Sequence, residues 1–205
     1  MTTLTLKSYQ QAALDSLNAF ARAAQTQGAA LAFGALAGRA YNAEAFGVQL
    51  PCVCLRIPTG GGKTVMAAHA VPLLAREWCN VDAPVAVWLV PSDAILQQTL
   101  KSLQTPGHPY RAALTEAYGE SLQVCLLGDV AQMAPPDWGR LAVVVVATIQ
   151  SFRIEDAGKR NVYSFSESFE PHFKGAQGTN GGRDLQCLHG LPDALVTAGD
   201  AAQDS

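Results

Sequence analysis

Short, almost continuous apolar runs alternate along this chain with longer segments in which apolar residues recur at helical spacing. Runs of this kind are typical of strands that are buried on both faces of a sheet. The run "LAVVVVAT" is the richest in β-branched residues and gives the strongest strand prediction. The predicted strands lie at residues 51–58, 83–91, 122–127 and 141–148.

Helical spacing appears ahead of the first run and between the later ones. The predicted helices lie at residues 8–25, 64–78, 92–103 and 110–118. Ser8 and Ser92 are candidate N-caps, and Pro72 should kink or divide the second helix. The Ala- and Gly-rich residues 28–47 predict a weak helix or a loop. Strands that alternate with helices predict an α/β fold, a parallel sheet with helices on both faces.

Composition and charge mainly exclude some classes of function. The chain has 205 residues, a net charge of -3 and five cysteines without a C-x-x-C pair. If the protein binds nucleic acid, it must therefore do so through a local basic patch or through backbone N–H donors, not through overall charge. Cys52 and Cys54 should point to one face of a buried strand as inert thiols. Reduced cysteines, no secretory signal and no apolar run near the ~20 residues of a membrane span predict a cytoplasmic protein without membrane contact.

Three parts are expected along the chain. Residues 1–50 are expected to form a helical N-terminal segment, and residues 51–173 are expected to form part of an α/β domain. Residues 174–205 are Gly-rich and weakly patterned, which predicts a poorly ordered tail.

The loop between the first run and the following helix reads "PTGGGKT". Glycines there let backbone N–H groups converge on one point, and a helix N-terminus favours an anion at the same place. The Lys63 ammonium would reach the β- and γ-phosphates of a nucleotide, and the Thr64 hydroxyl would ligate Mg²⁺. The alternative is a glycine-rich turn with an incidental lysine. The strand predicted before the loop and the helix predicted after it favour the phosphate site.

The spacing within the loop narrows the class of protein. The general pattern G-x-x-x-x-G-K-[ST] requires glycine where this chain has Ile57. The loop instead resembles motif I of superfamily 2 helicases and translocases, where proline or alanine often comes first. The resemblance implies that nucleotide is bound by Pro58, Thr59, Gly60, Gly61, Gly62, Lys63 and Thr64.

The N-terminal segment "LTLKSYQQAAL" resembles the helix of the same superfamily whose glutamine recognises adenine. The matching residue is Gln10, which follows Tyr9. A carboxamide can donate to and accept from the edge of an adenine. Taken without the resemblance, the segment is an ordinary amphipathic helix.

Two later segments resemble nucleic-acid contacts of that superfamily. "WLVPSDAILQQT" is similar to motif Ia, which lies on the nucleic-acid backbone. "ATIQS" is similar to a segment of the type III restriction endonuclease Res subunit and its helicase relatives. The implied contacts are Pro91, Ser92 and Gln97 from the first segment and Thr148, Gln150 and Ser151 from the second.

The resemblance spans about residues 4–173 and is closest to the Res subunit. It implies a RecA-like P-loop NTPase fold, incomplete here because only the N-terminal part of the first motor domain is present. It also implies ATP and Mg²⁺ as cofactors and an ATP-dependent DNA helicase or translocase as the full-length protein. The implied partners are DNA, contacted independently of sequence, the remainder of the motor, and a DNA methyltransferase (Mod) subunit.

The residues that hydrolyse ATP in this superfamily have no counterpart in the sequence. The family uses an Asp-Glu pair, in which Asp holds Mg²⁺ and Glu orients the attacking water. Asp129 precedes the "ATIQS" segment and is followed by Val130, so it is predicted to be a turn residue. The second motor domain and its arginine are missing as well. We therefore assign no catalytic residue and expect the chain alone to be inactive.

Two other functions stay open at this point. A stand-alone nucleotide-binding module would need a domain that closes at its C-terminus, which the Gly-rich tail does not suggest. A small-molecule kinase would need a lid with several basic residues, and only Arg153, Lys159 and Arg160 are near.

Overall fold

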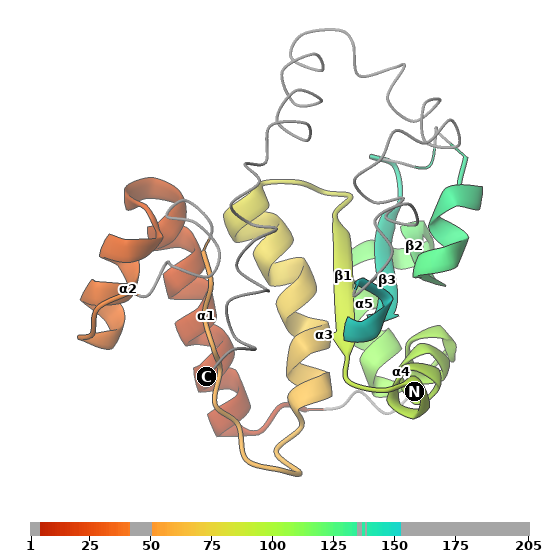
Figure 1. Cartoon of the computed structure of the whole chain (residues 1–205). Coiled ribbons are helices and arrows are strands. Elements are labelled where there is room, and N and C mark those ends of the chain that lie inside the picture. Colours follow the sequence, from red (N-terminus) through yellow and green to blue (C-terminus); the bar gives the residue numbers. More distant parts are fainter. Residues whose placement is uncertain (1–4, 42–50, 135–136, 138, 153–205) are drawn as a thin grey trace, which may run out of the picture. The chain divides into compact units, whose positions relative to one another are not determined.

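The structure, a computed structural model, describes residues 5–41, 51–134, 137 and 139–152. The chain groups into two compact units, residues 1–130 with 139–149, and residues 131–138 with 150–205. The first unit contains the five α-helices and the sheet drawn in Figure 1. The predicted tail, residues 174–205, lies outside the described residues.

Three parallel strands form the sheet of the first unit. They are β1 (Val85–Val90), β2 (Leu122–Leu126) and β3 (Ala142–Thr148), and β3 lies in the centre in the order β1-β3-β2. The register places Val90 opposite Thr148, so β1 and β3 end level with each other. The sequence predictions for these strands and for a parallel α/β sheet are confirmed.

The helices follow the sequence prediction closely. They are α1 (Ser8–Gln27), α2 (Ala29–Ala37), α3 (Lys63–Leu74), α4 (Asp93–Gln104) and α5 (Pro109–Tyr118). The helix α3 runs through Pro72 and passes into a π-helical segment, η1 (Ala75–Cys79). Short 3-10 segments complete the described elements: η2 (Gly119–Ser121), η3 (Leu127–Gln132) and η5 (Ile149–Phe152).

The main core lies between one face of the sheet and the helices α3, α4 and α5. Val144 and Val146 of β3 pack there with Leu103 of α4 and Leu114 of α5, and each of these side chains is at most 1 % exposed. Alternate residues of a strand point to the same face, which explains why even-numbered residues of β3 meet these helices. Ala68 belongs to the same cluster, so the core fixes α3 relative to the sheet.

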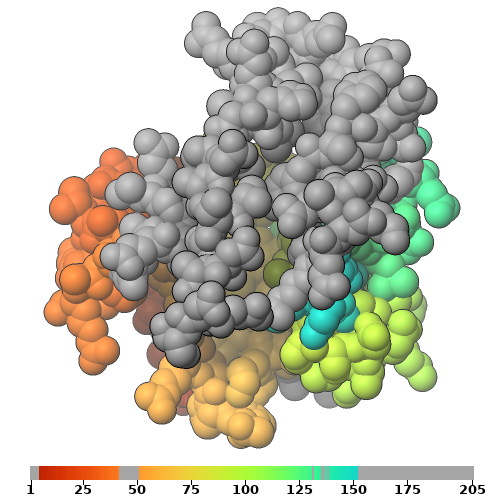
Figure 2. Space-filling view, viewed as in Figure 1, coloured from red at the N-terminus to blue at the C-terminus, as the bar shows by residue number. Residues whose placement is uncertain are grey.

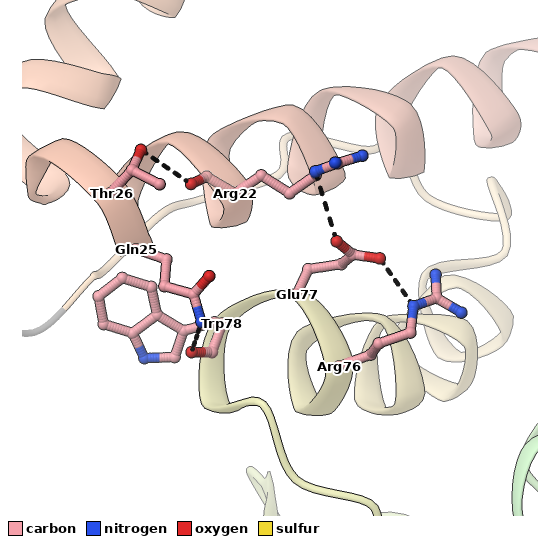
Figure 3. Close-up of polar contacts among 6 residues, drawn as sticks. All are labelled: Arg22, Gln25, Thr26, Arg76, Glu77 and Trp78. Atoms are coloured by element: carbon pink, nitrogen blue, oxygen red, sulfur yellow. Dashed lines mark hydrogen bonds and ion pairs between the residues drawn. The ribbon is translucent and has the colours of Figure 1, made fainter.

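A second apolar cluster joins α1 and α2 and includes Phe20 and Trp78. Polar contacts tie α1 to η1 along the edge of this cluster (Figure 3). The Arg22 guanidinium lies 3.5 Å from the Glu77 carboxylate, and the Gln25 amide donates to the carbonyl oxygen of Trp78 at 3.1 Å. Because Arg22 is largely exposed, its ion pair adds little stability, and the apolar contacts hold α1 in place.

The strand predicted at residues 51–58 is wrong. These residues form no strand, and Cys52 and Cys54 are exposed rather than buried. A strand needs a neighbour for its N–H and C=O groups, and no described strand pairs with this segment. The N–H group of Cys52 instead donates to the Tyr41 hydroxyl at 2.6 Å.

The N-terminal cap of α1 also differs from the prediction. The cap residue is Lys7, and Ser8 is the first residue inside the helix. The carboxamide oxygen of Gln10 accepts from the N–H of Lys7 at 2.9 Å, the glutamine half of a capping box. None of the helices that the structure describes is long and apolar enough to span a membrane.

Candidate functional site

The glycine loop before α3 adopts a backbone that only glycine accommodates well. Gly60 has φ 77° and Gly62 has φ 80°, in the left-handed region. Between them, the N–H of Gly61 donates to the carbonyl of Pro58 at 3.0 Å and closes a turn. A β-carbon on Gly61 would lie 2.6 Å from Cγ2 of Ile57, so this position needs glycine for space.

The loop leads directly into the N-terminus of α3. The cap residue is Gly62, no side chain accepts from the first N–H groups, and no acidic residue lies in the first turn. The first N–H groups of a helix have no partner within it, and the helix dipole makes their end positive. An anion is therefore favoured at this point. Thr64 lies in the first turn of α3 and is half-buried.

Lys63 lies across the loop in this structure. Its ammonium group donates to the carbonyl oxygens of Ile57 at 3.0 Å and Pro58 at 3.1 Å. The side chain is exposed, so water can replace either bond at little cost. The loop itself is part of the surface, since Pro58, Thr59 and Gly60 are exposed; its orange colour marks the lower edge of the view in Figure 2.

Two side chains from α1 also contact the loop. The Gln10 amide nitrogen and the Tyr9 hydroxyl both donate to the carbonyl oxygen of Gly61, each at 2.9 Å. Gln10 is only 7 % exposed, whereas Tyr9 is 41 % exposed. The structure thus places Gln10 beside the predicted loop, where its side chain bonds to the backbone of the loop. Tyr9 was not among the predicted site residues, although its place directly before Gln10 in the quoted motif was a usable signal.

Three of the four predicted nucleic-acid residues in the first unit lie at the carboxyl ends of strands. Pro91 and Ser92 directly follow β1, and Thr148 ends β3 at the register position of Val90. Ser92 is the N-cap of α4, and Gln97 lies in that helix with its side chain exposed. Thr148 is 5 % exposed and presents little surface to a ligand.

The other two predicted contacts, Gln150 and Ser151, belong to η5, the 3-10 segment that directly follows β3. Both are exposed. They fall in the second unit, so the structure does not test whether they act together with Ser92.

Acidic and titratable groups near the sheet have local roles. The Asp129 carboxylate accepts from the N–H of Leu126 at 3.1 Å, as expected of a turn residue. Burial lowers the pKa of His69 on α3, and the nearby Glu116 carboxylate opposes this shift in part. Among the described residues, no cluster of three or more His, Cys, Asp or Glu residues could hold a metal ion. The sequence prediction that the Thr64 hydroxyl ligates Mg²⁺ stays a prediction.

Comparison with known proteins identifies a family for most of the chain. A family model described as "Type III restriction enzyme, res subunit" matches residues 3–174 of the chain. Comparison with curated proteins and with solved structures gave no match.

Proposed function

Because the chain belongs to the family of the type III restriction enzyme res subunit, we propose that its glycine loop binds the phosphates of ATP for a motor that moves on DNA. The fold is that of a RecA-like P-loop NTPase, a helicase-type ATP-dependent motor domain. The observation that carries the proposal is the pair of left-handed glycines, Gly60 and Gly62, leading into an uncapped helix N-terminus with Lys63.

Each part of the loop has a separate task in phosphate binding. Backbone N–H groups of the loop and of the first turn of α3 donate to phosphate oxygens. Lys63 leaves the carbonyls of Ile57 and Pro58 and places its charge on the β- and γ-phosphates. The Thr64 hydroxyl would hold Mg²⁺, which, when bound, neutralises phosphate charge.

DNA is the proposed second ligand, bound through its backbone. Pro91, Ser92 and Gln97 would hold a phosphate at the start of α4, where Ser92 and Gln97 are exposed. Asp93 puts a carboxylate in the first turn of the same helix, and the net charge of the chain is -3, so binding should be weak and salt-sensitive. The resemblance of the "ATIQS" segment separately assigns Thr148, Gln150 and Ser151 to DNA. The remainder of the motor and a Mod methyltransferase subunit are the proposed protein partners.

Hydrolysis of ATP needs residues beyond those that bind it. The printed sequence contains no Asp-Glu pair of the kind that would hold Mg²⁺ and orient the attacking water. We therefore propose that this chain by itself binds ATP and hydrolyses it slowly at most. The family match gives no support to the small-molecule kinase alternative. The other alternative, a nucleotide-binding module that does not hydrolyse ATP, would behave in the same way as the chain proposed here.

Calorimetric titration with ATP and Mg²⁺ tests the phosphate site. Lys63→Ala should weaken binding by about 1.5–3 kcal/mol, the range for hydrogen bonds to charged groups. Lys101→Ala is the matched control, because Lys101 is an exposed lysine in the last turn of α4. The control should bind like the unaltered chain. Equal affinities for all three proteins would refute the proposed site.

A further inference from the structure

The strand β1 forms one edge of the described sheet, because the order β1-β3-β2 gives it a neighbour on one side only. On that side, the carbonyl oxygen of Pro84 accepts from the N–H of Val143 of β3 at 2.8 Å. Successive residues of a strand turn their N–H and C=O groups to opposite edges, so every second residue after Pro84 turns these groups away from β3. These outward residues are Val85, Val87 and Leu89. None of the described strands pairs with them on the outer side.

The same three residues expose apolar side chains on one face of the strand. Val85, Val87 and Leu89 are 51 %, 53 % and 51 % exposed. The opposite face of β1, with Ala86 and Trp88, packs against the main core. Every residue of β3 is buried, so the exposure begins at the edge of the sheet. An apolar edge strand with free backbone groups is a template for pairing with another strand.

Features that commonly protect an edge strand are missing from β1. Its sequence, VAVWLV, contains no charged residue and no proline, and its register with β3 is continuous, without a bulge. We propose that this edge is an interaction surface, and that it pairs antiparallel with the same edge of β1 in a second copy of the chain. The surface is separate from the glycine loop, so the inference does not depend on nucleotide binding.

A two-fold axis at Val87 gives a register in which the edge is complementary to itself. Val87 then lies opposite its own counterpart, and Val85 lies opposite Leu89 of the other copy. All of these residues turn their N–H and C=O groups outward, so each opposite pair exchanges two hydrogen bonds. Opposite residues of an antiparallel pair also place their side chains on the same face, so the exposed valine and leucine side chains contact each other.

A second copy fits this edge better than a charged partner does. The exposed side chains are aliphatic, so they offer no opposite charge to a nucleic acid or to an acidic or basic segment. The net charge of the chain is only -3, so two copies repel each other weakly. The other edge strand of the described sheet, β2, exposes no large apolar side chain. Pairing about a two-fold axis therefore uses up the one apolar edge of this sheet, and assembly stops at a dimer.

The small contact area implies a weak dimer. Three half-exposed side chains per copy fall short of the ~800 Å² per partner that a standard interface buries. We therefore expect a dissociation constant in the micromolar range or above, and a measurable equilibrium between monomer and dimer.

Sedimentation velocity at protein concentrations from micromolar to millimolar tests the proposal. The unaltered chain should shift with concentration from the monomer mass of 21.6 kDa toward twice that mass. Val87→Lys should raise the dissociation constant of the dimer at least about tenfold, because it places like charges directly opposite each other at the two-fold axis. Leu31→Lys is the matched control, since Leu31 is 68 % exposed on α2, and it should associate like the unaltered chain.

Two results of this measurement would overturn the inference. One is a monomer at every concentration of the unaltered chain. The other is equal association of the unaltered chain and Val87→Lys, because the contact would then lie elsewhere. Val87 is half-exposed, so lysine at this position should leave the fold intact, which circular dichroism checks.

Amide hydrogen exchange resolved by residue gives a second measurement, on the unaltered chain. The outward N–H groups of Val85, Val87 and Leu89 should exchange slowly at high protein concentration and fast after dilution. The inward N–H groups of Ala86 and Trp88 should stay protected at both concentrations, because they face β3. Fast exchange of the outward groups at every concentration would overturn the inference. Slow exchange that does not depend on concentration would overturn it too, because the chain would then cover its own edge.

Discussion

Alanine substitutions at Gly60 and Gly62 should separate the cost of backbone conformation from the cost of a clash. Both residues are left-handed, with φ 77° and φ 80°, so alanine at either position costs about 1–2 kcal/mol. Nothing lies within 4 Å of a β-carbon at Gly60. At Gly62 the new β-carbon meets the Gln10 amide nitrogen, and Gln10 must move away from Gly61 and Lys7.

Loss of these buried bonds adds about 1–3 kcal/mol to the cost of Gly62→Ala. We therefore expect Gly60→Ala to lower the free energy of unfolding by about 1–2 kcal/mol and Gly62→Ala by about 2–5 kcal/mol. Urea denaturation measures both, provided that the m-value is unchanged. In a Gln10→Ala background the difference between the two substitutions should shrink, because the side chain that clashes is gone. Equal losses for Gly60→Ala and Gly62→Ala in the unaltered chain would refute the contact between Gln10 and the loop.

Two further predictions concern titratable groups away from the loop. Burial lowers the pKa of His69 below its ordinary value of 6.5, so the unfolded chain takes up a proton first as the pH falls. The free energy of unfolding should decrease from pH 6.5 down to the pKa of His69 in the folded chain, and His69→Gln should remove this decrease in denaturation curves measured at several pH values. Burial, and secondarily the Asp129 carboxylate, raise the pKa of the Cys125 thiol. Timed alkylation with peptide mass mapping should find Cys125 slower to react than the exposed Cys52, Cys54 and Cys79, and equal rates would contradict the burial of Cys125.

Local pattern was enough to predict most of the described fold. Runs of Val and Leu gave β1, β2 and β3, and helical spacing gave α1, α3, α4 and α5 to within a few residues. These elements are amphipathic or fully buried, so their own residues carry the signal. The glycine turn before α3 was predictable for the same reason, because the residues that form it are consecutive, whereas phosphate binding by this loop stays a prediction.

What the sequence could not provide depends on partners distant along the chain. The run 51–58 has the composition of a strand, but composition does not supply a neighbouring strand to pair with. The bonds from Tyr9 and Gln10 to Gly61 join residues 52 and 51 positions apart. Gln10 was predicted as a site residue from its motif, but its target could be seen only once α1 and the loop were placed together.

The missing strand and the contacts from α1 have a common consequence for the loop. In a strand–loop–helix site, the strand fixes the first end of the loop and the helix fixes the second. Here α3 fixes the second end, whereas residues 51–58 form no strand that could fix the first. The turn from Gly61 to Pro58 and the two donors of α1 take that place. We therefore expect α1 to shape the proposed phosphate site through the backbone of the loop. Substitutions that loosen α1 should then weaken nucleotide binding even where they leave every residue of the glycine loop intact.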